Sequence, residues 1–150
     1  MVETVAAILE RSVQSAIKAW FKRIQTDEKA MSILLSYEQR SGPLPQVFRD
    51  VVSRLLSSKP IGSKELVSAA AVQHGLERRK QKYTSAMMVE DSRMLQVTIF
   101  DTLQHNLASI NFSVSLIGVM TIADEIDSQL SQAMTSYITQ SVSDALPVEA

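Results

Sequence analysis

Few side chains in this sequence could do chemistry, and the histidines come first. The chain has two histidines and no cysteine, so it has no disulfide framework, no thiolate zinc site and no thiol nucleophile. His74 follows Val67 and Ala71 on one apolar stripe and precedes Gly75, which allows a close approach of backbone or ligand. Such a histidine can be an axial haem ligand, although a hydrogen-bonded core histidine is the more common case.

The other polar candidates are typical of surface groups. His105 stands one helical turn after Asp101, which predicts a solvated pair rather than a base for a hydroxyl nucleophile. Glu90, Asp91 and the acidic residues of 124–127 are expected near helix caps or on exposed faces, where adjacent residues do not face one another. The glycines at 42, 62, 75 and 118 are isolated, which excludes a phosphate-binding loop. We therefore expect no catalytic site, no metal site and no enzyme.

Charge is unevenly distributed along the chain. All 15 Lys and Arg residues lie at or before Arg93 together with ten of the 16 acidic residues, so this part carries +5 and the remainder −6. A net charge of −1 argues against a dedicated nucleic-acid binder, while the polarity can steer association. The basic run 78–82 could bind a phosphate or an acidic partner, but it ends a predicted helix, where the helix dipole favours cations.

The elements that must position these residues are predicted to be helices throughout. The chain has 150 residues, 45% of them hydrophobic and 21% charged, with only four glycines and four prolines, which suits one all-α domain. Apolar spacing predicts six helices, the last two being the longest, and Ser63 as the N-cap of the fourth. We expect one domain over 1–140 and a frayed polar tail over 141–150. The expected helices are 2–24, 27–38, 46–57, 63–82, 85–107 and 113–140.

The last helix carries a regular apolar seam. Seven residues alternate by three and four, which is a heptad pattern typical of helix pairing. Other apolar residues flank this seam, so we expect the helix to contact both its own core and a second subunit. The predicted dimer interface and signalling seam consists of Leu116, Val119, Ala123, Ile126, Leu130, Ala133 and Tyr137.

A membrane span is the alternative for the uncharged stretch 102–123. Several polar residues interrupt this stretch, and no Lys or Arg follows it to set an orientation. The N-terminus lacks the basic start and apolar run of a signal peptide. We therefore expect a cytoplasmic protein with no membrane partner.

One group of motifs resembles a known family. His74-Gly75 is followed by an arginine, an aromatic residue that opens a long helix, and Glu and Arg on the first turns of that helix. Together with Leu44-Pro45, the segment that starts at Phe48, and Trp20, this pattern resembles the N-terminal domain of the RsbR/RsbRD co-antagonist proteins, also found ahead of bacterial sensor histidine kinases. The resemblance covers most of 1–110 and departs from the family at Lys82, where glycine is frequent. The motif residues are His74, Gly75, Arg78, Tyr83, Glu90 and Arg93.

The resemblance implies a six-helix globin-like bundle without haem that serves as an input module in bacterial signal transduction, such as a stress response. It implies a homodimer formed through the last two helices, and an output partner such as a STAS-domain protein or a histidine kinase. In globin order the helix of His74 is the one that carries the proximal histidine. Three hypotheses follow: a non-enzymatic sensory or regulatory domain, a haem sensor with His74 as axial ligand, and a helical adaptor that binds a partner helix in a groove.

Overall fold

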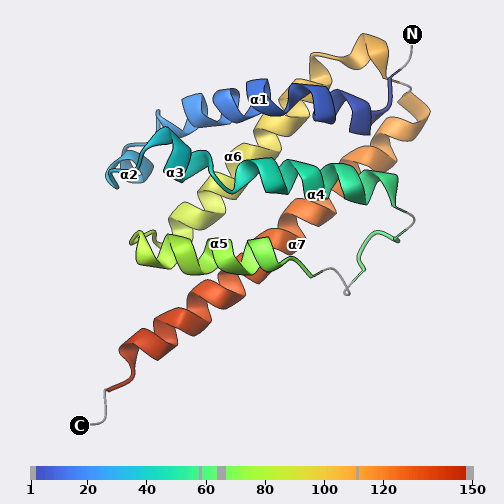
Figure 1. The fold of residues 1–150 in the computed structure, drawn as a ribbon. Coiled ribbons are helices and arrows are strands. Elements are labelled where there is room, and N and C mark those ends of the chain that lie inside the picture. Colours follow the sequence, from blue (N-terminus) through green and yellow to red (C-terminus); the bar gives the residue numbers. More distant parts are fainter. Residues whose placement is uncertain (1–2, 58, 64–66, 111, 148–150) are drawn as a thin grey trace.

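The computed structural model describes residues 3–57, 59–63, 67–110 and 112–147, with the backbone alone at 107 and 112–115. The described part is all-α, as predicted, and its one β-feature is an isolated bridge between Glu3 and Ile110. Figure 1 shows α1 and α4 lying across α6 and α7, with α5 against α7. The helices are α1 (Val5–Ile24), α2 (Glu28–Met31), α3 (Tyr37–Ser41), α4 (Leu44–Leu56), α5 (Ala69–Lys80), α6 (Ser85–Gln104) and α7 (Phe112–Ala145), with a 3₁₀ turn at Leu107–Ser109.

The expected helix 27–38 is two short helices. Asp27 caps α2 through its side chain, and Ser36 with Gln39 forms a capping box that starts α3. These two strong start signals lie too close together for one helix. Leu34, which falls inside the expected helix 27–38, lies in the connection between α2 and α3 and is 94% exposed.

The fourth expected helix starts later than predicted. The hydroxyl of Ser68, not of Ser63, accepts the backbone N–H of Ala71 and caps α5 at its start. Gly62 has a φ of 82° and donates its N–H to Asp124, which holds this segment in a turn on α7. Val67 therefore precedes the helix instead of sharing a stripe with His74, and Leu66 lies outside the described residues.

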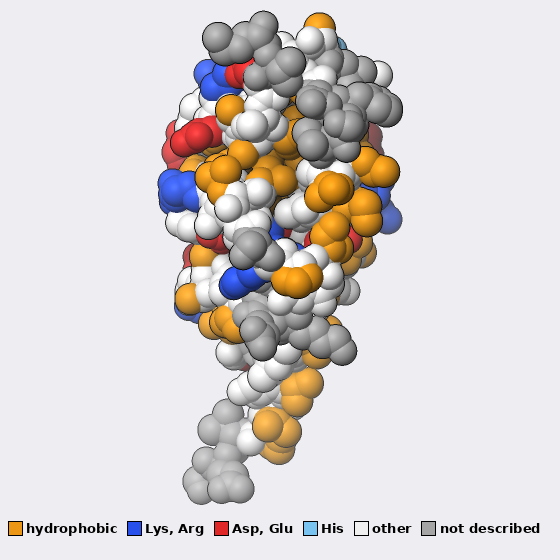
Figure 2. All heavy atoms as spheres, turned by 90° about the vertical axis from the view of Figure 1, so that its right-hand side faces the viewer, with side chains coloured by type: hydrophobic (Ala, Val, Ile, Leu, Met, Phe, Trp, Pro, Cys, Tyr) orange, Lys and Arg blue, Asp and Glu red, His pale blue; other side chains and the backbone are white. Residues whose placement is uncertain are grey.

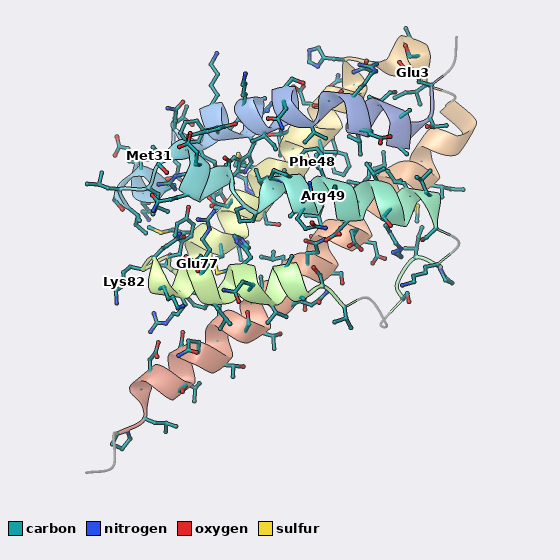
Figure 3. The ribbon with its side chains drawn as sticks, viewed as in Figure 1. Glu3, Met31, Phe48, Arg49, Glu77 and Lys82 are labelled. Carbon is teal, nitrogen blue, oxygen red and sulfur yellow. The ribbon has the colours of Figure 1, made fainter. Side chains whose placement is uncertain are left out.

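The core lies where α1 crosses α4, α6 and α7. Its largest fully buried side chains include Trp20, Phe48 and Ile99. Figure 3 labels buried Phe48 on α4 together with its neighbour Arg49, which is exposed. A smaller apolar cluster of Tyr83, Met88, Ala133 and Tyr137 joins the α5–α6 connection to α6 and α7. The apolar residues that recur every three or four positions in the first and fifth expected helices are largely in the core. The buried ones are Ala6, Leu9, Ala16 and Trp20 of α1 and Met88, Leu95, Ile99 and Leu103 of α6.

The last helix, α7, has 34 residues and continues to Ala145 instead of ending at Gln140. The start of the expected frayed tail is therefore helical. Side chains there make hydrogen bonds to residues one turn away: the Gln140 amide donates to Asp144, and the Ser141 hydroxyl donates to the Tyr137 carbonyl. The C-terminal end of α7 extends beyond the other helices (Figure 1). Within the described ranges, no helix is long and apolar enough to cross a membrane.

Candidate functional site

An open cavity of about 620 Å³ lies between α5 and the facing sides of α4, α6 and α7. Its mouth is formed by exposed residues such as Gln39, Gln73 and Glu77, whereas its inner wall contains buried Asp91. Concave, mostly apolar sites with a few convergent polar groups are where small molecules bind in proteins. The apolar wall consists chiefly of Leu44, Val47, Met88, Leu95, Ile126, Leu130 and Ala133.

Helix α5 forms one side of this cavity because it packs very closely on α7. A Cβ atom at Gly75 would overlap the carbonyl oxygen of Ala133 and the hydroxyl of Ser136. The Ser136 hydroxyl lies 2.8 Å from the carbonyl oxygen of Val72, to which it donates. Glycine at position 75 therefore allows α5 and α7 to cross closely, and this crossing places His74 in the cavity wall. The sequence predicted that Gly75 allows such a close approach of backbone.

His74 is held as a neutral imidazole. Its Nδ1 is inaccessible and has no hydrogen-bond partner among the described residues, so the expected hydrogen bond of a core histidine is not made there. Burial, together with the positive charge of Arg78, lowers the pKa of His74 to about 3. At neutral pH this residue offers one nitrogen lone pair, one N–H group and an aromatic surface, but no charge.

Tyr83 is the centre of a buried polar cluster next to the cavity, formed with Arg40, Arg78 and Asp91. Arg40 donates to the Tyr83 hydroxyl at 2.7 Å, and the Arg78 guanidinium carbon lies 4.7 Å from the centre of the Tyr83 ring. The Tyr137 hydroxyl donates to the Tyr83 carbonyl oxygen. Burial raises the pKa of Tyr83 to about 12. The Tyr83 cluster therefore joins α3, α5, α6 and α7.

Asp91 corrects the expectation that this carboxylate is exposed or near a cap. It is only 9% exposed, it lines the cavity, and its Oδ1 has no partner in the part of the chain that the structure describes. Burial raises the pKa of Asp91 to about 6, although Tyr83, Arg78 and Arg40 oppose this rise. Sequence analysis missed this residue, although Asp91 lies three residues after Met88 and four before Leu95 on the predicted buried stripe.

The six motif residues separate into two groups. His74, Gly75, Arg78 and Tyr83 meet at the cavity and the Tyr83 cluster. Glu90 and Arg93 instead form a two-point ion pair with each other at 2.6 and 3.0 Å, and Arg93 is exposed. This second pair therefore contributes a solvated surface feature of α6.

Lys82 adopts the backbone conformation that glycine favours. Its φ is 66°, in the left-handed region. The backbone N–H of Tyr83 donates to the Arg78 carbonyl and that of Lys82 to the Arg79 carbonyl, which is a Schellman motif with Lys82 at its left-handed position. The turn thus has the geometry that suits the glycine of the resembled family, with lysine in its place.

The predicted seam on α7 packs mainly within the chain. Ile126, Ala133 and Tyr137 are buried, and Val119, Ala123 and Leu130 are half-buried, so only Leu116 of the seven is exposed. Among the described residues of this region, the exposed large apolar ones are Leu116 and five residues outside the seam. They are Leu116, Ile117, Met120, Ile138, Val142 and Leu146, and Figure 2 shows hydrophobic side chains along the projecting end of the molecule.

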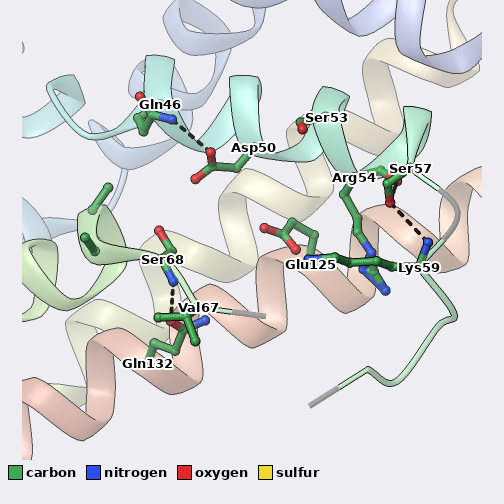
Figure 4. A pocket seen from close by; sticks show the side chains of 12 residues that line it. Gln46, Asp50, Ser53, Arg54, Ser57, Lys59, Val67, Ser68, Glu125 and Gln132 are labelled. Carbon is green, nitrogen blue, oxygen red and sulfur yellow. Dashed lines mark hydrogen bonds between the residues drawn. The ribbon is translucent and has the colours of Figure 1, made fainter. Parts of the chain in front are cut away.

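A second, polar pocket of about 520 Å³ lies between α4, the start of α5 and α7 (Figure 4). Buried Arg54 donates to the Pro60 carbonyl and to Asp124, each at 2.8 Å, and the Ser68 N–H donates to Gln132 at 2.7 Å. These contacts attach the connection between α4 and α5 to α7. Asp124 is therefore paired and Glu125 is buried, which corrects the expectation that the acidic residues of 124–127 are all solvated.

The remaining polar predictions concern the surface. His105 is exposed and its Nδ1 lies 3.6 Å from Asp101 Oδ1, which confirms the solvated pair. In the basic run, Arg78 is buried and Arg79 pairs with Asp144 at 3.4 Å. The described residues contain no group of three or more His, Asp or Glu side chains able to hold a metal ion.

Comparison with protein families, curated proteins and solved structures finds no significant match to this chain. The all-α architecture stands on the structure alone. The globin-like topology and the resemblance to the RsbR/RsbRD domain stay predictions.

Proposed function

We propose that this chain is a non-enzymatic input domain of signal transduction, in which the cavity receives the stimulus and α7 transmits it. One observation carries the proposal: Ile126, Leu130 and Ala133 of α7 form part of the cavity wall, and the same helix extends beyond the bundle (Figure 1). A molecule in the cavity contacts the helix that leaves the domain.

The change that α7 undergoes is a small displacement between two packed arrangements, which is a common form of switching. Its close crossing with α5 at Gly75 leaves no room for a gradual adjustment. An occupant that pushes on the wall therefore moves α5 and α7 relative to each other. The resemblance supports this role, with a STAS-domain protein or a histidine kinase as the output partner.

Dimerisation is the second part of this proposal. Tyr137 is committed to the Tyr83 cluster, so the pairing surface is formed by outward residues instead of the predicted seam. Ile138 and Val142 lie one turn apart on the projecting end of α7, are each more than half exposed, and are followed by exposed Leu146. A second copy that pairs along this stripe would cover it.

The test is the mass of the protein in solution by sedimentation equilibrium. We expect a dimer for the wild type and a monomer for the double variant Ile138→Ser, Val142→Ser. Leu34→Ser is the matched control, because Leu34 is 94% exposed and lies far along the chain in the α2–α3 connection. A wild type that is monomeric at all concentrations contradicts the dimer and favours the adaptor hypothesis. An unchanged dimer in the double variant contradicts this interface.

Haem sensing is a second candidate function, favoured by the neutral imidazole of His74 in the wall of a 620 Å³ cavity. The residues fit haem in kind, since they offer an apolar cavity and a neutral nitrogen donor. Bound haem would supply a site for gas binding or redox change. The test is titration with haemin: a Soret band that elutes with the protein and disappears in His74→Ala supports haem, and a protein that retains none leaves the haem-free input domain.

A further inference from the structure

We propose that the cavity binds an amphipathic organic cation, an amine on an apolar body, with Asp91 as the counter-charge. This inference rests on the proposed input function for its biological meaning, because it names the class of the stimulus. The binding itself follows from the charges and the shape of the cavity, and can be measured separately.

Acidic side chains outnumber basic ones among the described residues that line the cavity. Three charged residues line it, namely Glu77, Arg78 and Asp91, and His74 adds none. Arg78 donates to the Gln81 amide and to backbone carbonyls of α3, and lies over Tyr83, so that only its Nε is without an acceptor. Its N–H donors are thus largely used within the protein, while its positive charge still acts on His74 and Asp91.

Asp91 is only partly compensated: the Tyr83 side chain and the positive charges of Arg78 and Arg40 act on its carboxyl group. None of the ion pairs in the described structure includes it, and its Oδ1 is without a hydrogen bond. Arg40 lies outside the cavity wall and gives its hydrogen bonds to Tyr83 and to the Ile33 carbonyl. A buried carboxylate with an open oxygen binds an ammonium group well, because charge-assisted hydrogen bonds are the stronger ones.

The apolar inner wall of the cavity indicates that the bound amine also carries an apolar body. Asp91 and the apolar side chains of α4, α6 and α7 lie inside, whereas Glu77, labelled on α5 in Figure 3, is exposed at the mouth. Two carboxylates along one path attract cations and repel anions. A fatty carboxylate of the same length would bring a like charge towards Asp91, which disfavours both ionised forms.

Trp20 provides a direct reporter of occupancy. It is the only tryptophan of the chain, it is 1% exposed, and its indole N–H donates to the backbone carbonyl of Asp91 at 3.0 Å. Its emission responds to changes at Asp91. The probes are octylamine, octanol and octanoate, which share one alkyl chain, do not fluoresce, and differ in their head groups.

We expect octylamine to change the Trp20 emission in a saturable way, with octanol at least tenfold weaker and octanoate weaker still. Asp91→Asn should lower the affinity for octylamine by roughly tenfold or more and leave that for octanol unchanged, since one charge-assisted hydrogen bond is lost. Ala70→Phe, which places an aromatic ring at the exposed mouth, should weaken all three. This variant retains the native Asp91 and tests the location if Asp91→Asn fails to fold.

Two results overturn the inference: octanoate binds as tightly as octylamine, or Asp91→Asn leaves the preference for octylamine over octanol unchanged. The proposed input function is contradicted by a different result. If octylamine binds as expected but the mass of the protein and the hydrogen exchange of α7 are the same with and without it, the site stands and the signalling role is wrong.

Discussion

At the scale of single residues, Asp91 makes the folded state sensitive to pH. Its pKa rises from 3.8 to about 6 on folding, so between these values the folded protein binds the proton more tightly than the unfolded chain does. The stability contributed by this group is therefore highest at low pH and decreases as pH rises towards 6. Asp91 is thus kept at a cost to stability, which agrees with a binding role for its carboxylate.

The first prediction follows from this difference. Asp91→Asn should be more stable than the wild type at neutral pH, by up to about 3 kcal/mol for a pKa difference of this size. The advantage should disappear as pH falls towards 4. Urea unfolding of both proteins across this range measures it, and an advantage that grows towards low pH would show that Asp91 is stabilised as the anion.

Lys82 gives the second prediction. A residue with a Cβ atom in the left-handed region costs roughly 1–2 kcal/mol, and glycine avoids most of this cost. Lys82→Gly should therefore stabilise the protein by about 0.5–1 kcal/mol in thermal unfolding. The control is Gln73→Gly, at an exposed position inside α5, which should destabilise the protein by about 1 kcal/mol. Equal losses in both variants would contradict the turn geometry.

Sequence patterns identified some of these residues and missed others for a physical reason. His74, Gly75, Arg78 and Tyr83 were found because their types and spacing are distinctive. Asp91 was not found, because polar type alone predicts exposure and only its partners on other helices reveal its burial. Buried Arg40 was missed in the same way, since its partner Tyr83 lies 43 residues away.

At the scale of elements, the α5–α7 crossing supplies the third prediction. Gly75→Ala should destabilise the protein by about 1–3 kcal/mol, since the added methyl group overlaps backbone that cannot move alone. Gln73→Ala, at an exposed position of the same helix, should have little effect. Thermal unfolding compares them, and a neutral Gly75→Ala would mean that the two helices are farther apart than described.

The segment between α4 and α5 gives the fourth prediction. Arg54→Gln should release this segment from α7, because the pair with Asp124 and the bond to Pro60 are lost together. Hydrogen exchange at the Gly62 amide should speed up, since its acceptor Asp124 loses its position. Arg49→Gln is the control, because Arg49 is exposed on the same helix and bonds only to Gln46. Unchanged exchange in Arg54→Gln would contradict this role.

The element types followed from apolar spacing, but several boundaries did not. The all-α architecture and the long last helix were predicted because apolar periodicity over many residues is a strong signal. The start of α5 was placed too early, since Ser63 and Ser68 are both suitable caps and the turn on α7 decides between them. The face that α7 buries was also decided by contacts between helices far apart in sequence.

At the scale of the whole molecule, ion pairs within the fold compensate part of the charge difference between the basic first part of the chain and its acidic second part. Among the residues that the structure describes, three ion pairs join a basic residue of the first part to an acidic residue of the second: Arg23 to Asp101, Arg54 to Asp124 and Arg79 to Asp144. The polarity therefore holds the later helices against the earlier ones. Fewer unpaired charges are therefore available to steer a partner than the sequence alone suggests.

The length of α7 has a mechanical consequence. From the crossing at Ala133 to its end at Ala145 the helix advances about 18 Å at 1.5 Å per residue. A rotation of about five degrees around that crossing would swing the far end by roughly 1.5 Å over this length. If α7 transmits the stimulus as proposed, it would act as a lever whose short arm lies in the cavity wall and whose long arm carries Ile138 and Val142. In the proposed dimer, a ligand no larger than the cavity would then change how two projecting ends meet.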